Sequence, residues 1–313
     1  MKVKVFGLMF TSWMLVAFTN ISHSAAQEGV SGLSSSPAAA SVTKTVPPAF
    51  RHTGAAHVAN GVALRNRASG WIHLRGVPVG STIVAAYLYW NFSDGSAIGA
   101  ATASALFDGN RVSGTKVADS ADPCWGMAGN HSYRALVTAF VPGTRPNEDY
   151  EVSLLGGFTT SGQNPWSPTE AQTIRAEGAT LIVVYSGPTT VGRTVVIYNA
   201  FSGSMFFSGT GSFTLTGSPG SGSGLFTMTG ADGQRGAGHD NGASNETGTF
   251  NAAAMSGPPT AASDWDGSAG LPLVQLWDVH THRVSLATPS NVVVYTSGAD
   301  CLVPVAFVVQ LGL

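Results

Sequence analysis

The segment from Thr82 to Asn91 is apolar on both of its faces, and no other feature of the sequence constrains the fold as strongly. In a β-strand, successive side chains point to opposite sides of the sheet. One side of this segment is expected to carry Ile83, Ala85, Tyr87 and Tyr89, and the other Val84, Ala86, Leu88 and Trp90. A strand that is apolar on both sides is covered on both sides. The segment therefore predicts a layered β structure with this strand in its interior.

The rest of the chain consists of short strand-like segments separated by turn-forming residues. Glycine, proline and Asp-Gly pairs punctuate them, and Asp108-Gly109 is a typical two-residue hairpin turn. Only residues 133–140 carry apolar side chains at helical spacing, which predicts a short helix there. Strands at this density predict an all-β fold, a jelly-roll-like β-sandwich with long glycine-rich loops. The expected strands are 58–64, 71–74, 82–91, 103–107, 111–117, 150–155, 179–185, 194–198, 213–216, 225–229, 273–277, 282–286, 292–295 and 303–311.

Residues 1–26 have the pattern of a secretory signal peptide. A basic start, Met-Lys-Val-Lys, precedes an apolar run from Val5 to Phe18, and Ser24 and Ala26 fit the small-residue cleavage positions. A membrane anchor needs about 18 or more uninterrupted apolar residues, and this run contains Thr11 and Ser12. The chain is therefore predicted to be cleaved after Ala26 and to be secreted, extracellular or on the cell surface, with the periplasm as an alternative. No membrane span is expected after cleavage.

The remainder of the chain is predicted to form one domain behind a leader. Residues 27–50 are rich in Ser, Ala and Pro and contain few aromatic residues, which is typical of a flexible segment. Removal of the signal leaves 313 − 26 = 287 residues, enough for one large domain or two small ones. We expect residues 51–313 to form a single β-sandwich domain.

The two cysteines, Cys124 and Cys301, lie far apart in the exported part of the chain. An even number of cysteines in an oxidising compartment indicates a disulfide. Closing a loop of this length stabilises a fold by about 4–5 kcal/mol in the chain-entropy model, less any strain. The alternative is a pair of free buried thiols. A long-range bridge favours one continuous sandwich over two separate domains.

The composition limits the classes of partner. Charged residues make up only 10% of the chain, and 17 acidic residues outnumber 15 basic ones. Without a basic patch, nucleic acids and anionic membranes are poor candidate partners. The expected surface consists of hydroxyl, amide and backbone groups.

Six short stretches spread over most of the chain form a set. They are AYLYW at 86–90, FDG at 107–109, EGATLIVVY at 177–185, DGQ at 232–234, WD at 277–278 and ADCL at 299–302. In this order they resemble an uncharacterised β-rich domain of bacterial and archaeal secreted and cell-surface proteins. The resemblance implies a jelly-roll or sandwich surface module and supplies no catalytic residue.

A polar, glycine-rich stretch from Thr229 to Glu246, with Asp264-Trp265-Asp266-Gly267 shortly after it, is a candidate Ca²⁺ site. Calcium prefers six to eight oxygen ligands from carboxylates, amides and carbonyls on tightly turning loops. The candidate ligands are Asp232, Asp240, Asn241, Asn245, Asp264 and Asp266. The alternative is a set of Asx-turns in an exposed loop.

The sequence Asp278-Val279-His280-Thr281-His282 is a second candidate metal site. Residues two apart on a strand project from the same face, so Asp278, His280 and His282 could converge on one ion. The alternative is that Asp278 caps a turn and the histidines face solvent or form local hydrogen bonds.

Tryptophans in turn-like contexts are candidate ligand-binding residues. Trp166 and Trp265 lie in such contexts, as does Trp125, whereas Trp71, Trp90 and Trp277 are expected in the core. An exposed indole beside Asp and Asn suits a sugar, which has apolar ring faces and hydroxyl edges. A loop tryptophan can instead cover the end of the sandwich.

These observations favour a non-enzymatic module that binds a glycan or another extracellular surface component, such as a surface protein. The chain lacks the Gly-x-Ser-x-Gly, His-Glu-x-x-His and phosphate-loop motifs of common catalytic sites. A secreted polysaccharide hydrolase remains the alternative, because glycosidase carboxylates are recognised only by their geometry.

Overall fold

The computed structural model describes residues 41–122, 125–163, 174–207, 209–234, 246–255, 264–269, 275–297 and 301–313. The described elements are β-strands, apart from two single 3₁₀ turns, η1 (Thr138–Phe140) and η2 (Pro188–Thr190). The predicted all-β sandwich class is therefore confirmed. Within these ranges, no helix is long and apolar enough to cross a membrane. The predicted signal peptide lies outside the described residues.

An eight-stranded antiparallel sheet contains most of the first half of the chain. Its first and last strands, β3 and β4, also contact each other, so the sheet is nearly closed like a barrel. In order, its strands are β3 (Ala55–Ala63), β10 (Ile174–Ser186), β5 (Thr82–Asp94), β8 (Gly129–Leu136), β7 (Asn110–Ser120), β6 (Thr102–Phe107), β9 (Asp149–Leu155) and β4 (Ser69–His73).

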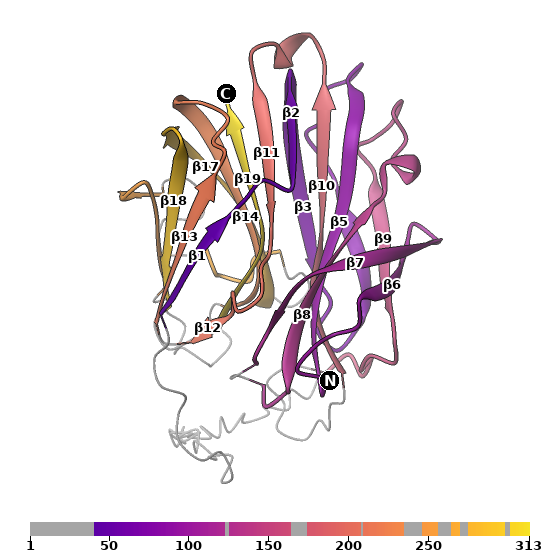
Figure 1. Ribbon diagram of the computed structural model, residues 1–313. Helices are drawn as coiled ribbons and strands as arrows, with labels where there is room; N and C mark the ends of the chain where they lie inside the picture. The colour runs from indigo at the N-terminus through magenta and orange to yellow at the C-terminus, as the bar shows by residue number, and fades with distance from the viewer. Residues whose placement is uncertain are drawn as a thin grey trace, which may run out of the picture. The chain divides into compact units, whose positions relative to one another are not determined.

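Two further sheets are built mainly from the second half (Figure 1). The six-stranded sheet has the order β17 (Gln275–Leu286), β14 (Gly222–Gln234), β19 (Cys301–Leu311), β11 (Thr194–Asn199) and β2 (Phe50–Thr53), with β12 (Phe206–Phe207) paired to β19. The five-stranded sheet has the order β1 (Val42–Val46), β13 (Thr210–Thr216), β18 (Ser290–Thr296), β15 (Thr247–Phe250) and β16 (Ala253–Ala254).

The six-stranded sheet is the middle layer, because apolar clusters cover both of its faces. One cluster joins it to the eight-stranded sheet and includes Ile182 of β10 and Val308 of β19. Another joins it to the five-stranded sheet and includes Phe307 of β19 and Val293 of β18. A third cluster, around Trp90, fills the inside of the curled eight-stranded sheet. Consistent with this placement, residues 301–310 of β19 are all buried.

The strand that most constrained the fold, β5, is covered on both faces as predicted. Leu88 and Trp90 point into the curled sheet, and Tyr89 points toward the middle layer. A β-bulge next to β10 inserts Val84 as an extra residue, and it turns Ile83 toward the inside of the curled sheet. The predicted grouping of Ile83 with Tyr89 is therefore wrong, because one extra residue exchanges the faces of a strand.

Local turn chemistry is confirmed at one hairpin, and the helix prediction is wrong. Asp108 and Gly109, both with positive φ, connect β6 to β7, as a type I′ turn requires. Residues 129–136, in contrast, form strand β8 between β5 and β7, and only the single turn η1 follows. Pairing on both edges outweighs the short helical pattern.

The expected boundary at residue 50 between leader and domain is also wrong. Strand β1 already begins at Val42 and pairs in parallel with β13, and Val46 is buried in the core. Strand β2, from Phe50 onward, closes the middle sheet beside β11. Residues 27–40 lie outside the described residues.

Candidate functional site

The candidate site lies at one edge of the middle sheet, on strand β17. Trp277 points from this strand toward the eight-stranded sheet, where it packs against Gly61 and Gly178 and donates a 2.9 Å hydrogen bond to Thr180 Oγ1. A side chain at Gly178 would overlap the indole, so the glycine is needed for this close approach. By strand alternation, Asp278, His280 and His282 project to the other face.

A loop from Asp264 to Ala269 lies beside β17. The Ala269 backbone N–H donates to the Trp277 carbonyl at 3.1 Å, and the Ala63 N–H donates to the Ala269 carbonyl at 3.3 Å. These bonds hold the loop between β17 and β3. They bring Asp266 and Ser268 next to His280.

Three oxygen atoms surround the Nε2 atom of His280. Asp266 Oδ1 lies at 3.2 Å, Asp278 Oδ1 at 3.3 Å and Ser268 Oγ at 3.2 Å. The Ser268 backbone N–H contacts both carboxylates, at 3.0 Å from Asp266 Oδ1 and 3.2 Å from Asp278 Oδ1. All three titratable residues are buried, and their candidate ligand atoms lie within 4.8 Å of one another.

The electrostatics of the cluster follow from burial and mutual hydrogen bonding. Burial would raise the pKa of Asp266, but hydrogen bonds with His280 and Ser268 outweigh it and lower the pKa to about 2. Burial raises the pKa of Asp278 to about 7, against the influence of His280. Burial would lower the pKa of His280, but Asp266 and Asp278 together raise it to about 10. The ring is therefore cationic at neutral pH, and one carboxyl group is poorly stabilised as an anion.

A neighbouring pair joins one residue from each of the two predicted metal sites, Asp264 and His282. His282 Nε2 lies 2.5 Å from Asp264 Oδ1, and the Tyr295 hydroxyl donates to Asp264 Oδ2 at 3.0 Å. His282 and Asp264 thus form a separate, buried pair. The convergent cluster instead combines Asp266 from the first predicted set with Asp278 and His280 from the second.

Asp232, another residue of the predicted calcium set, contacts different side chains from Asp264 and Asp266. Its Oδ1 accepts a 2.7 Å hydrogen bond from Trp125 Nε1 and lies 3.8 Å from Arg65 Nη2. Asp240, Asn241 and Asn245 lie outside the described residues, so their part of the prediction is untested.

The ion cluster around Asp232 contains residues that the sequence reasoning missed. Arg65 forms a buried ion pair with Glu177, and the guanidinium groups of Arg65 and Arg175 lie 4.2 and 5.0 Å from the Trp125 ring centroid. The available signal was Glu177 itself, a carboxylate at the start of the long apolar run of β10. A charge within a buried strand requires a partner.

A groove of about 530 Å³ opens beside the convergent cluster. Asp266, Ser268 and His280 line one part of it, and Trp71 and His73 of β4 line another. Trp71 is 51% exposed, whereas Ile72 between these two residues is fully buried. Trp71 was expected in the core, and the alternation of β4 places it outside instead.

The other predicted aromatic ligand residues do not provide an exposed surface among the described residues. Trp265 is completely buried and packs edge-on against Tyr295 at 5.3 Å, so its interpretation as a ligand platform is wrong. Trp166 lies outside the described residues. Trp90 and Trp277 belong to the core as predicted.

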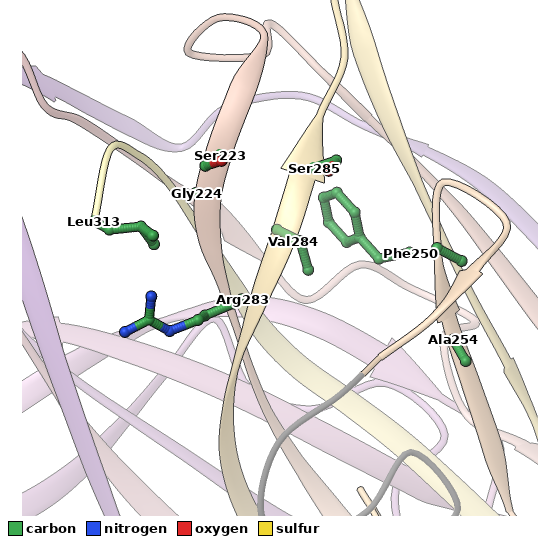
Figure 2. A pocket seen from close by; sticks show the side chains of 9 residues that line it. Ser223, Gly224, Phe250, Ala254, Arg283, Val284, Ser285 and Leu313 are labelled. Atoms are coloured by element: carbon green, nitrogen blue, oxygen red, sulfur yellow. The ribbon is translucent and has the colours of Figure 1, made fainter.

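A second groove, of about 370 Å³, lies between β14, β17 and the C-terminal residue (Figure 2). Ser223 and Ser285 line it together with Phe250, Leu313 and one charged side chain, that of Arg283. Among the described residues, no Asp, Glu or His side chain lines it. It therefore has fewer side chains that could bind a metal ion or transfer a proton than the groove beside His280.

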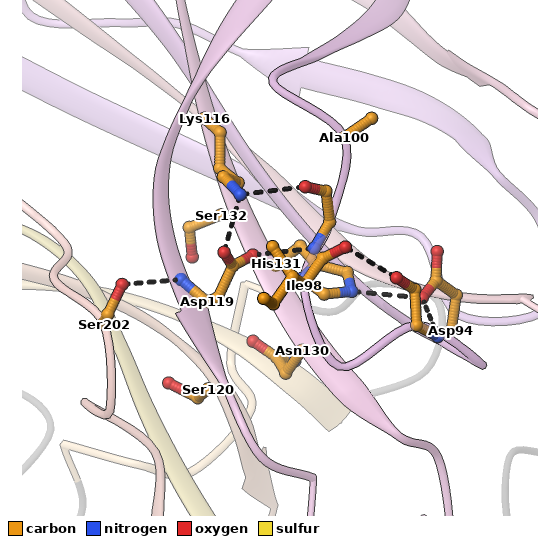
Figure 3. Close-up of polar contacts among 12 residues, drawn as sticks. Asp94, Ile98, Ala100, Lys116, Asp119, Ser120, Asn130, His131, Ser132 and Ser202 are labelled. Carbon is orange, nitrogen blue, oxygen red and sulfur yellow. Dashed lines mark hydrogen bonds and ion pairs between the residues drawn. The ribbon is translucent and has the colours of Figure 1, made fainter.

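A second histidine cluster lies on β5, β7 and β8 of the eight-stranded sheet (Figure 3). The buried ring of His131 lies 2.7 Å from Asp119 Oδ1 through Nδ1 and 3.0 Å from Asp94 Oδ1 through Nε2. Lys116 Nζ donates to Asp119 Oδ2 at 2.7 Å and to the Gly99 carbonyl at 2.8 Å. These contacts tie the β5–β6 loop to β7 and β8.

The predicted disulfide remains a prediction. Cys301 begins β19 and is buried, and Cys124 lies outside the described residues.

The arrangement around His280 does not fit a Ser–His–Asp relay. In that relay the serine and the carboxylate contact opposite nitrogens of the ring. Here Ser268, Asp266 and Asp278 all contact Nε2.

No protein-family model and no curated protein sequence matches this chain.

Proposed function

We propose that this protein is an exported, non-catalytic β-sandwich module that binds an extracellular glycan in the groove beside Trp71. The observation that carries the proposal is the 51% exposed indole of Trp71 on a regular strand, next to a groove with polar side chains. A half-exposed indole on a rigid strand supplies a flat apolar surface at little entropic cost. Sugar rings present such a flat face.

The polar lining of the groove complements the edges of a sugar. Asn60 and Ser268 supply amide and hydroxyl groups, and Asp266 supplies a carboxylate. Sites for small ligands commonly combine an apolar surface with a few placed polar groups. The low content of charged residues, 10% of the chain, also favours an uncharged ligand over a nucleic acid.

The proposal includes the Cys124–Cys301 disulfide. Trp125 follows Cys124 directly and bonds to Asp232, whose neighbour Ala231 pairs with Val303 in the β14–β19 ladder. Val303 is only two residues from Cys301. Alkylation without reductant should leave the intact mass of the mature protein unchanged, and two alkylated thiols would refute the bridge.

Glycan binding is tested with the mature protein, from residue 27 onward, on a glycan array and on insoluble polysaccharides. Trp71→Ala should weaken binding at least ten-fold, which is about 1.4 kcal/mol. Leu136→Ala is the matched control, because Leu136 is a 63% exposed apolar residue that does not line the groove. Equal binding by Trp71→Ala and wild type contradicts the site, and absence of binding to every glycan contradicts the function.

The same samples distinguish a polysaccharide hydrolase. Release of reducing ends by wild type would contradict the non-catalytic proposal. Asp266 and Asp278 would then be the first carboxylates to replace by asparagine.

A further inference from the structure

The hydrogen bonds that His280 can donate do not satisfy all of the oxygen atoms that surround its Nε2 atom. One ring nitrogen carries at most one hydrogen, yet Nε2 faces three oxygens at 3.2, 3.2 and 3.3 Å. These distances are longer than the usual 2.9–3.0 Å of N–H···O bonds. Neighbouring ligand atoms around a metal ion are spaced about 3 Å apart, because each lies about 2.0–2.2 Å from the ion. The cluster therefore has the spacing of a ligand set.

A second observation concerns the carboxylate of Asp278. Its side chain is completely buried, and its Oδ2 atom has no hydrogen-bond partner among the described residues. A buried carboxylate oxygen without a partner is costly to maintain. A bound cation would compensate that cost.

The ion pairs of the cluster also favour a bound cation. Two carboxylates, Asp266 and Asp278, share one histidine, and in the described part of the chain no lysine or arginine forms an ion pair with either. The cluster therefore places two carboxyl groups against a single imidazole. Buried charges in proteins are usually paired or bound to a metal.

The donor atoms indicate the class of metal. Calcium and magnesium prefer sites made of oxygen atoms alone. An imidazole nitrogen together with two carboxylates suits Zn²⁺ or Mn²⁺, which accept mixed nitrogen and oxygen ligands. We propose that Asp266, Asp278 and His280 bind one Zn²⁺ or Mn²⁺ ion at the edge of β17.

The site also has access from outside. Asp266, Ser268 and His280 line the 530 Å³ groove, so an ion held there is reachable from solvent. Three protein ligands leave coordination positions for water or for a hydroxyl group of a ligand. The metal site goes beyond the glycan proposal and does not depend on it.

The test uses tag-free mature protein that has been dialysed against EDTA and then against buffer. Calorimetric titration with Zn²⁺ and Mn²⁺, in separate experiments without any glycan, should show one equivalent of saturable binding for at least one of them. Saturation should raise the melting temperature by several degrees, because only the folded state holds the ligand set. Failure of both ions to bind at up to about 1 mM, near −4 kcal/mol, would overturn the proposal.

Variants assign the ligands. His280→Gln and Asp266→Asn should each weaken binding at least ten-fold, a loss at the low end of those seen around metal sites. Should one variant fail to fold, the other provides the test. His73→Gln is the matched control, because His73 lines the same groove, is 67% exposed and pairs with Asp149 instead. Unchanged binding in both site variants would overturn the assignment, as would binding lost only in His73→Gln.

Substitution by Co²⁺ tests whether the His280 nitrogen is a metal ligand. Co²⁺ in place of the native ion should give visible absorption bands that change in His280→Gln. Saturable binding of Ca²⁺ with no binding of Zn²⁺ or Mn²⁺ would show that the nitrogen is not a ligand and would contradict the proposal.

Discussion

The two histidine–carboxylate clusters differ in how their hydrogen bonds are distributed. His131 uses each ring nitrogen for one carboxylate, at 2.7 and 3.0 Å, and Lys116 Nζ also donates to Asp119 (Figure 3). His280 presents one nitrogen to three oxygens, at 3.2 to 3.3 Å. Both clusters are rich in carboxylates. Only the first balances donors against acceptors.

The difference separates a structural role from a binding role. A network whose donors and acceptors are all used contributes rigidity and gains nothing from an ion. A network with too many acceptors for its donors retains an unmet demand for positive charge. Substitutions in the two clusters should therefore act in opposite directions on the stability of the metal-free protein.

The largest expected effect is at the cluster of His131, Asp94, Asp119 and Lys116, which we call the balanced cluster. Among the described residues, His131 is the one whose side chain contacts both Asp94 and Asp119, so His131→Ala should lower the free energy of unfolding by about 4 kcal/mol. Urea denaturation measures this, with EDTA or with Zn²⁺ present, and the loss should be the same. His73→Ala, at an exposed site, should change stability by less than about 0.5 kcal/mol. If Zn²⁺ restored the stability that His131→Ala loses, the His131 cluster would also bind metal and the two clusters would not differ in role.

A third histidine extends the comparison to a site without carboxylate contacts. His57 contacts Gln310 Oε1 at 2.9 Å and Thr227 Oγ1 at 2.8 Å between the two large sheets. Burial lowers the pKa of His57 to about 4, although the bond to Gln310 opposes it.

Because the folded state of the protein disfavours protonated His57, stability should fall as pH drops from about 6.5 to about 4, by up to about 3 kcal/mol. Urea denaturation at several pH values measures the slope. His57→Gln should flatten it between these limits, and an unchanged slope would contradict the assignment.

The smallest effect, and one of opposite sign, is expected at Asp278. Its pKa is raised to about 7 by burial, so the stability that it contributes is full below about pH 4 and is lost as pH rises through 7. In EDTA at pH 8, Asp278→Asn should therefore raise the free energy of unfolding by about 1–2 kcal/mol. At pH 4 the gain should vanish.

The corresponding change in the balanced cluster, Asp119→Asn, should lower stability at pH 8, because it weakens contacts with Lys116 and His131. Losses of stability in both variants would mean that Asp278 is as well satisfied as Asp119. The two clusters would then be equivalent.

Part of the fold could be predicted because it depends on local pattern. The two apolar faces of β5 and the Asp108-Gly109 hairpin follow from side-chain alternation and from turn geometry. The β-bulge at Val84 could not be predicted, since it arises from the register with β10. The apolar spacing of residues 133–140 predicts a helix, but residues 129–136 form strand β8. The pairing of β8 with β5 and β7 decides this, and it is also a long-range property that local spacing does not reveal.

The candidate site could be predicted only in fragments. The spacing of Asp278 and His280 indicates that both lie on one face of a strand, but it does not distinguish His282, which pairs with Asp264. Trp71 and Trp265 were assigned in reverse, because exposure depends on which face of a strand or loop the neighbouring sheets cover.

By itself, the sequence determined an all-β protein with one strand buried on both sides, since alternation and turn residues act over a few positions of the chain. Only the tertiary structure decided that Asp266 meets Asp278 and His280. That meeting depends on the loop 264–269 lying between β17 and β3, through backbone bonds from Ala63 and to Trp277. Such contacts join segments through space, and no local pattern encodes them.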